Sequence, residues 1–127
     1  ATYRAQTQFN ENAKILAVHA TFPELAHNMI EGFGADCQKN FVLFAHTDYV
    51  SENVSIAARV VENVLRQKGV VLYKIPILGD NFEKQFFNVI LWSDFASVYL
   101  GNLKNIDVVS VPVIESLKKE QKLHGIN

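Results

Sequence analysis

FVLFAHTDYVSENVSIAARVVENVLRQKGVVLYKIPI, residues 41–77, is the stretch that decides the fold. It begins and ends with apolar runs, FVLFAHT and VVLYKIPI, that are continuous rather than alternating, which is typical of parallel strands covered on both faces. The residues between the two runs have helical spacing, and Gly69 follows them where a left-handed C-terminal cap would stand. The apolar face of this helix comprises Ala57, Val60, Val61, Val64 and Leu65. The stretch therefore predicts a strand–helix–strand unit with parallel strands.

Three further apolar runs extend this pattern along the chain: KILAVHA (14–20), NVILWS (88–93) and DVVSVPV (107–113). With them the sequence predicts a three-layer Rossmann-like or flavodoxin-like α/β domain with a mostly parallel five-stranded sheet. We expect its most buried residues to include Val42, Leu43, Phe44, Val89, Ile90 and Leu91.

Helical spacing predicts the elements that connect these runs. Helices are expected over residues 23–33, 94–105 and 113–125, whereas GDNFEKQF (79–86) allows only a short helix or a loop. Residues 1–12 are polar and aperiodic, so we expect an N-terminal arm there, followed by a single domain over residues 13–127.

Composition and charge narrow the function classes. The chain has 127 residues, 49% of them hydrophobic and 20% charged, which indicates one ordinary globular domain. A net charge of −1 argues against binding of duplex nucleic acid, because such binding depends on clustered Lys and Arg. The single cysteine, Cys37, excludes an intramolecular disulfide and favours a reducing compartment, and no apolar run reaches the ~20 residues of a membrane span. We expect a cytoplasmic protein, and the missing initiator methionine leaves an organelle matrix open.

Small polar side chains follow three of the predicted strands. Ligands of open parallel sheets bind beyond the carboxyl ends of the strands, so Thr21, Thr47 and Ser93 are the candidate ligand-binding residues. Each also precedes a predicted helix, whose free N–H groups attract anions. Because Ser, Thr and Asp are ordinary helix caps as well, these turns are open to a purely structural interpretation.

His19 and His46 are the candidate acid–base pair, since imidazole titrates near neutral pH and both would end neighbouring strands. Structural histidines at the sheet rim are the alternative. The four histidines show no close ligand pair, so no metal site is expected. Neither GxGxxG nor GxxxxGK[ST] occurs, and we expect no cofactor.

The order of segments resembles the CRISPR-associated Rossmann-fold (CARF) ligand-binding domains. KILAVHATFPELAHNMI (14–30) is similar to their first strand and ligand turn, and residues 40–77 are similar to their second strand, long helix and third strand. NVILWSDFASVYLGNLKNIDVVSVPV (88–113) occupies the place of their glycine-rich turn and helix, although WSDFA has neither its glycines nor its basic residue. The resemblance implies a sensor of a nucleotide-type ligand held by Thr21, Thr47 and Ser93, more consistent with a binding module than with an enzyme. It also implies a homodimer.

Two alternatives stay open at this point. A structural or adaptor subunit of a larger assembly would keep the α/β fold and have a degenerate ligand turn, which suits the missing glycines of WSDFA. A small metal-free enzyme that uses His19 or His46 is the other.

Overall fold

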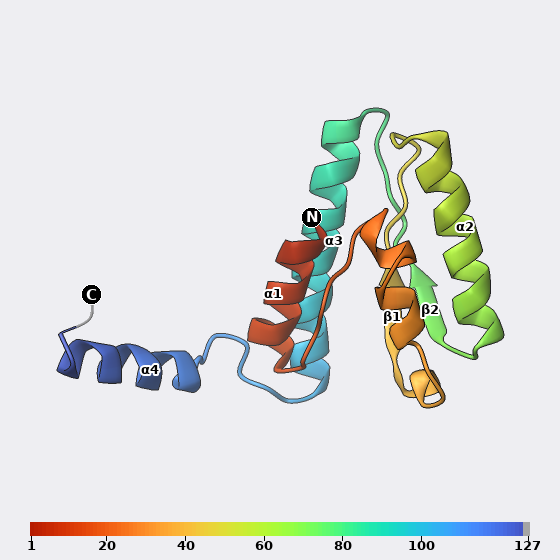
Figure 1. The fold of residues 1–127 in the computed structure, drawn as a ribbon. Coiled ribbons are helices and arrows are strands. Elements are labelled where there is room, and N and C mark those ends of the chain that lie inside the picture. The colour runs from red at the N-terminus through yellow and green to blue at the C-terminus, as the bar shows by residue number, and fades with distance from the viewer. Residues whose placement is uncertain (126–127) are drawn as a thin grey trace.

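The strand–helix–strand unit predicted over residues 41–77 is confirmed in the computed structural model, which describes residues 1–125. Strand β1 (Phe41–Phe44) leads into helix α2 (Glu52–Gln67) and then into strand β2 (Val71–Lys74). The strands are parallel, in register from Phe41 opposite Val71 to Phe44 opposite Lys74. Gly69 has a φ of +76°, as expected for the left-handed residue that ends a helix. The chain is thus an α/β protein, with α2 crossing between parallel strands (Figure 1).

Six further elements complete the described part of the chain. Helix α1 (Thr2–Ala13) comes first, followed by the short 3₁₀ helices η1 (Glu24–Ala26), η2 (Met29–Gly32) and η3 (Cys37–Lys39). After β2 come the long helix α3 (Phe82–Leu103) and helix α4 (Pro112–Leu123). Figure 1 shows α1 beside α3, with the sheet between α3 and α2.

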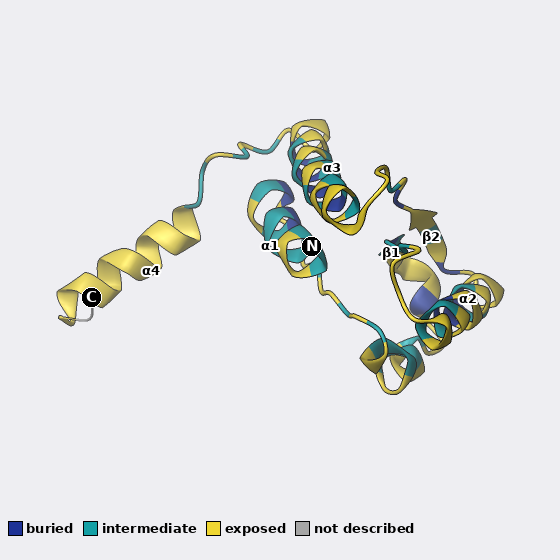
Figure 2. Cartoon of the chain, turned by 90° about the horizontal axis from the view of Figure 1, so that it is seen from above, coloured by how far each residue is buried: buried dark blue, intermediate teal, exposed yellow. Residues whose placement is uncertain are grey.

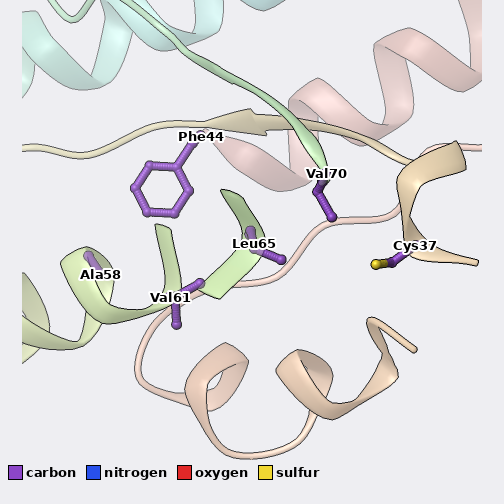
Figure 3. Close-up of a cluster of buried hydrophobic side chains, with 6 residues drawn as sticks. All are labelled: Cys37, Phe44, Ala58, Val61, Leu65 and Val70. Carbon is purple, nitrogen blue, oxygen red and sulfur yellow. The ribbon is translucent and has the colours of Figure 1, made fainter. Parts of the chain in front are cut away.

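One hydrophobic core lies between α2 and the sheet. Ala58, Val61 and Leu65 project from one face of α2 onto Phe44 and Val70 (Figure 3). Cys37 closes the cluster at its edge, and the loop and 3₁₀ segment over residues 22–33 covers it from outside. Val60, predicted on this face of α2, is exposed instead.

The second packed unit is the pair α1 and α3, which run in the same direction. The face of α3 under α1 is a row of mostly small residues at every fourth position, namely Val89, Ser93, Ser97 and Gly101. Small residues let the two backbones approach closely. Asn12 Nδ2 donates to Ser97 Oγ at 2.8 Å, and Arg4 forms an ion pair with Asp94 at 2.8 Å.

The expectation of a polar arm over residues 1–12 was wrong in its secondary structure, since these residues belong to α1. Most of their side chains are polar, and the helix is held on α3 by two buried apolar residues, Phe9 and Ala13. Tertiary packing, rather than a clear apolar stripe, holds this helix. The assignment of residues 13–127 to one domain stays a prediction.

Three of the five predicted strands are wrong, so the described residues contain a two-stranded rather than a five-stranded sheet. Residues 14–20 and 107–111 are irregular, and residues 88–93 lie inside α3. Asn81 caps α3 by accepting the backbone N–H of Lys84 at 2.9 Å, so the helix begins well before the apolar run. A buried strand and an apolar helix both have a continuous run of apolar residues in the sequence, so hydrophobic periodicity does not distinguish between them. As a result Leu91, expected in the sheet core, is exposed on α3.

Helix α4 confirms the helix expected near the C-terminus, with Pro112 in its first turn. All of its residues are exposed, and it stands away from the remaining elements (Figure 2). Within residues 1–125, none of the helices combines the length and the apolar character that crossing a bilayer requires.

Candidate functional site

The candidate site is the rim at the carboxyl ends of β1 and β2, where the turns leading into α2 and α3 meet. The backbone N–H of Ile75 donates to the carbonyl of Phe44 at 3.0 Å, so the strands remain paired up to this edge. Both following helices, α2 and α3, therefore start at the same side of the sheet (Figure 1). In open parallel sheets this is the side at which ligands bind.

Thr47 joins the two turns of the rim. Its Oγ1 donates to Gln85 Oε1 at 2.5 Å and accepts the backbone N–H of Tyr49 at 3.1 Å. Gln85 Nε2 in turn donates to the Gly79 carbonyl at 3.1 Å, and the Tyr49 hydroxyl donates to the Asp80 carbonyl at 2.6 Å. The network fixes the turn after β1 to the first turn of α3, which makes the rim a preformed polar edge.

His46 lies on the same rim with one ring nitrogen unused. Its Nε2 is buried and has no hydrogen-bond partner among residues 1–125. A buried polar atom without a partner costs roughly 1–3 kcal/mol, so such atoms in native proteins usually face a ligand, an ordered water or another part of the protein. His46 is therefore the polar group of the rim whose bonding capacity is still available.

The loop that carries Thr21 lies beside the end of β1. The ring of Phe22 packs edge-on against Phe44, with their centroids 6.2 Å apart, and the carbonyl of Thr21 accepts the N–H of Leu25 as η1 begins. Thr21 is exposed, as is His27, which follows η1. The structure thus brings the loop of Thr21 to the edge occupied by His46 and Thr47.

Ser93 and His19, by contrast, lie elsewhere. Ser93 is fully buried in the middle of α3, where its Oγ donates to the Val89 carbonyl at 2.7 Å, so the strand-end argument for this residue fails. His19 ends no strand. Its backbone N–H and its Nδ1 both contact Gln6 Oε1, at 3.0 and 2.5 Å, and its ring packs on Tyr3 of α1. His19 and His46 are therefore held on different elements, α1 and the sheet rim.

One ion-pair network ties α2 to the end of β2. Glu62 accepts from Lys74 Nζ and from Arg66, each at 3.0 Å. These hydrogen bonds, that of Lys74 first, hold the pKa of Glu62 below its ordinary value. Within residues 1–125 there is no group of three His, Cys, Asp or Glu side chains that could hold a metal ion.

Sequence reasoning did not single out Gln85. Gln85 was overlooked because GDNFEKQF was interpreted as a loop or a short helix, whereas it contains the start of a helix of 22 residues. The signal that could have identified it is Asn81, an N-cap residue type directly before an uninterrupted run of residues compatible with helix.

Comparison with known proteins places this α/β chain in the class of SIS domains. More specifically, it belongs to the family of C-terminal SIS domains of bacterial phosphoglucose isomerases, whose family model matches residues 1–120.

Its relatives include bifunctional phosphoglucose/phosphomannose isomerases. The protein of Thermoplasma acidophilum is 33% identical over 117 residues, which is 92% of this chain and 37% of the relative. That of Thermoplasma volcanium is 31% identical over 122 residues, 93% of this chain and 38% of the relative. That of Aquifex aeolicus is 29% identical over 126 residues, covering 96% and 39%. The chain spans about two fifths of the length of these relatives.

The family membership corrects the functional interpretation of the sequence. The resemblance to CARF domains was wrong, and with it the nucleotide-sensor function and the alternative of an adaptor with a degenerate ligand turn. Polar side chains after the strands of an α/β sheet do not distinguish one ligand class from another. In addition WSDFA, predicted to occupy the place of a ligand turn or a helix cap, lies inside α3.

Proposed function

We propose that this chain is part of a sugar-phosphate isomerase that acts on phosphoglucose and phosphomannose. The identity of 33% with a bifunctional phosphoglucose/phosphomannose isomerase over 92% of the chain is the observation that supports it. Because the chain spans about two fifths of such relatives, we expect the complete active site to include residues outside the 127 described by this sequence.

The contribution of this chain, in our proposal, is the rim at the carboxyl ends of β1 and β2. A sugar phosphate presents hydroxyl groups and a dianion. The hydroxyl of Thr21 and the free Nε2 of His46 can hydrogen-bond to such groups, and Thr47, whose O–H is donated to Gln85, keeps one lone pair that can accept from a sugar hydroxyl. The N-termini of α2 and α3 favour the negative charge. Ser93, buried under α1, is left out of this site.

Isomerisation of an aldose to a ketose moves a proton between neighbouring carbon atoms and therefore needs an acid–base group. His46 is the imidazole on the rim itself, and His27 is an exposed imidazole in the adjacent loop. The ring of His19 is oriented by Gln6, but it lies against α1. We therefore rank His46 and His27 before His19 as the acid–base candidates.

The experiment is a steady-state assay of the intact protein with glucose 6-phosphate and with mannose 6-phosphate. Thr47→Val should raise KM, because it removes the hydroxyl that fixes the turn after β1 to the first turn of α3 and that can accept from a sugar hydroxyl. His46→Gln should lower kcat/KM at least about 10-fold, as the loss of one useful hydrogen bond predicts. His124→Gln, at an exposed histidine that directly follows α4, is the matched control. Wild-type protein without activity on either sugar would contradict the proposed function, and full activity of His46→Gln would remove the rim from it.

We further propose that β1 and β2 belong to a larger, mostly parallel sheet of five strands in three layers. Within the described residues β1 and β2 pair only with each other, so each strand has one edge whose backbone groups lack a strand partner. The missing strands would come from residues outside this chain. Hydrogen exchange of the intact protein tests this, because amides along both edges of β1 and β2 should then be protected.

A cytoplasmic location also remains a proposal. It is supported by Cys37, a free and buried thiol that suits a reducing compartment.

A further inference from the structure

Gln85, at the start of α3, has a side-chain amide whose orientation is fixed by its two partners. One end of the amide faces the Gly79 carbonyl at 3.1 Å, and the other end faces the Thr47 hydroxyl at 2.5 Å. Because a carbonyl oxygen only accepts, the amide nitrogen is the end that faces Gly79 and the amide oxygen is the end that faces Thr47. The amide oxygen has no proton, so the hydrogen in the contact between Gln85 and Thr47 comes from the threonine hydroxyl.

The Gly79 carbonyl that orients this amide has a fixed position itself. Gly79 has a φ of +138°, and a Cβ atom built there would lie 2.6 Å from Lys84 Cβ and 3.0 Å from the backbone nitrogen of Gln85. Only glycine therefore fits this close to α3 in this conformation. The next residue, Asp80, is held from the other turn, because its carbonyl accepts from the Tyr49 hydroxyl at 2.6 Å.

The Thr47 hydroxyl consequently keeps one bonding site, and this site is an acceptor. A hydroxyl group has one proton and two lone pairs. The proton is donated to Gln85, and one lone pair accepts the backbone N–H of Tyr49 at 3.1 Å. The second lone pair has no partner within residues 1–125, and it binds only a group that donates a proton.

We propose that Gln85 is a positioning residue that determines which part of a sugar phosphate binds at Thr47. The inference rests on the proposed binding of a sugar phosphate at this rim. A phosphate dianion has only acceptor oxygens, whereas each hydroxyl of the sugar has a proton to donate. By taking the Thr47 proton, Gln85 leaves Thr47 without a donor for the phosphate, so a sugar hydroxyl binds there and the phosphate binds elsewhere.

Replacement of Gln85 changes this division in a way that depends on the new side chain. Methionine has a similar length but no amide oxygen, so in Gln85→Met the Thr47 proton is free to turn toward a ligand. Thr47 then offers a donor to a phosphate as well as an acceptor to a hydroxyl. In Gln85→Glu the acceptor for the Thr47 proton is kept, and the added negative charge acts on every ligand that carries a phosphate.

The test measures the binding of two ligands to the intact protein by isothermal titration. They are inorganic phosphate and glucitol 6-phosphate, a polyol phosphate that has the hydroxyls of the sugar but cannot isomerise. Gln85→Met should lower the ratio of the phosphate Kd to the glucitol 6-phosphate Kd at least about 5-fold, which is the effect of about one hydrogen bond. Gln85→Glu should keep the wild-type ratio within about 2-fold, because the acceptor for Thr47 remains.

The ratio distinguishes positioning from a merely structural contact. If Gln85 only tied the two turns together, its loss would weaken both ligands alike and leave the ratio unchanged. Gln67→Met is the matched control, since Gln67 is an exposed glutamine at the end of α2 away from the rim (Figure 1), and it should change neither Kd.

A second variant keeps the test valid if Gln85→Met fails to fold. Thr47→Val should raise the Kd of glucitol 6-phosphate about 3–10-fold and change that of inorganic phosphate by less than about 2-fold, because Thr47 has no proton for the phosphate. An unchanged ratio in Gln85→Met, an equal fall of the ratio in Gln85→Glu, or an equal rise of both Kd values in Thr47→Val would overturn the inference. Failure of the wild-type protein to bind glucitol 6-phosphate would overturn it as well. The expected ratios without any isomerase activity would instead refute the proposed reaction and leave the role of Gln85 in place.

Discussion

Substitution of Gly101 by alanine tests the packing of α1 on α3, because the sign of its effect is unusual. Gly101 lies inside α3, at the end of the row of small residues under α1. A Cβ atom built there would lie 2.5 Å from Val108 Cγ1 and 2.7 Å from the carbonyl oxygen of Asn12. The second atom belongs to the backbone of α1, which does not move aside without separating the two helices.

Two opposing effects determine how much Gly101→Ala changes the free energy of unfolding. In an unconstrained helix interior, replacing glycine by alanine raises the free energy of unfolding by about 1 kcal/mol. Inserting a methyl group into a tightly packed contact lowers it by about 1–3 kcal/mol. We expect the packing term to dominate and Gly101→Ala to destabilise the protein by about 1 kcal/mol, which lowers Tm by about 3–4 °C for a domain of this size.

The assay is thermal unfolding of the intact protein by calorimetry, with Asn102→Ala as the matched control. Asn102 is the exposed neighbour of Gly101 on the same helix, so its replacement reports helix propensity alone and should raise the free energy of unfolding by a few tenths of a kcal/mol. Gly101→Val should cost more than Gly101→Ala, since it adds two further methyl groups. An equal or higher Tm for Gly101→Ala would refute the close contact between α1 and α3.

Three further predictions concern the sheet unit and the start of α3. Leu65→Ala should lower the free energy of unfolding by about 2–5 kcal/mol in urea denaturation, because Leu65 is buried in the core between α2 and the sheet, whereas Val60→Ala on the exposed face should change it by less than about 0.5 kcal/mol. Glu62→Gln should lower the free energy of unfolding by about 0.2–1 kcal/mol at pH 7 and by progressively less below pH 4.5. The reason is that the pKa of Glu62 is lowered in the folded state, so the stabilisation by its charge is lost as the pH falls through the folded-state pKa. A stability difference between wild type and variant that does not change with pH would contradict this. Asn81→Ala should cost about 1 kcal/mol through loss of the cap on Lys84 N–H, and Asn81→Asp, which keeps an acceptor, should restore it.

The strand–helix–strand unit was predicted correctly because its hydrophobic pattern agrees with the environment in which each side chain packs. The apolar face of α2 matches the core that it meets, apart from Val60, and Gly69 ends the helix at a positive φ. In this unit the hydrophobic spacing and the glycine are each compatible with only one type of secondary structure.

The errors occur where the same local pattern has two solutions. Residues 89–92 are apolar without interruption, which fits both a buried strand and a helix that is packed on more than one side. The signal that decides for the helix is the N-cap residue Asn81, which lies outside this run. The polar segment 1–12 forms a helix because of a partner, α3, that lies about 90 residues away in sequence, as the Arg4–Asp94 contact shows. His46 and Thr47 follow β1, the strand that the sequence predicted, and their role in a site stays a prediction.

The composition of α3 explains the error in the strand prediction. A helix that faces solvent on one side normally shows one apolar stripe, and an α-helix that is apolar all round is normally buried. In α3 one side is buried by α1, through Ser93, Ser97 and Gly101, while Trp92 stacks on Tyr73 of β2 with their ring centroids 5.8 Å apart. The remaining side is also apolar, but its large residues are exposed within residues 1–125, namely Phe87, Leu91, Phe95, Tyr99 and Leu103. The continuous apolar run that resembles a buried strand therefore arises because α3 is apolar on the sides that meet α1 and β2 and on its exposed side as well.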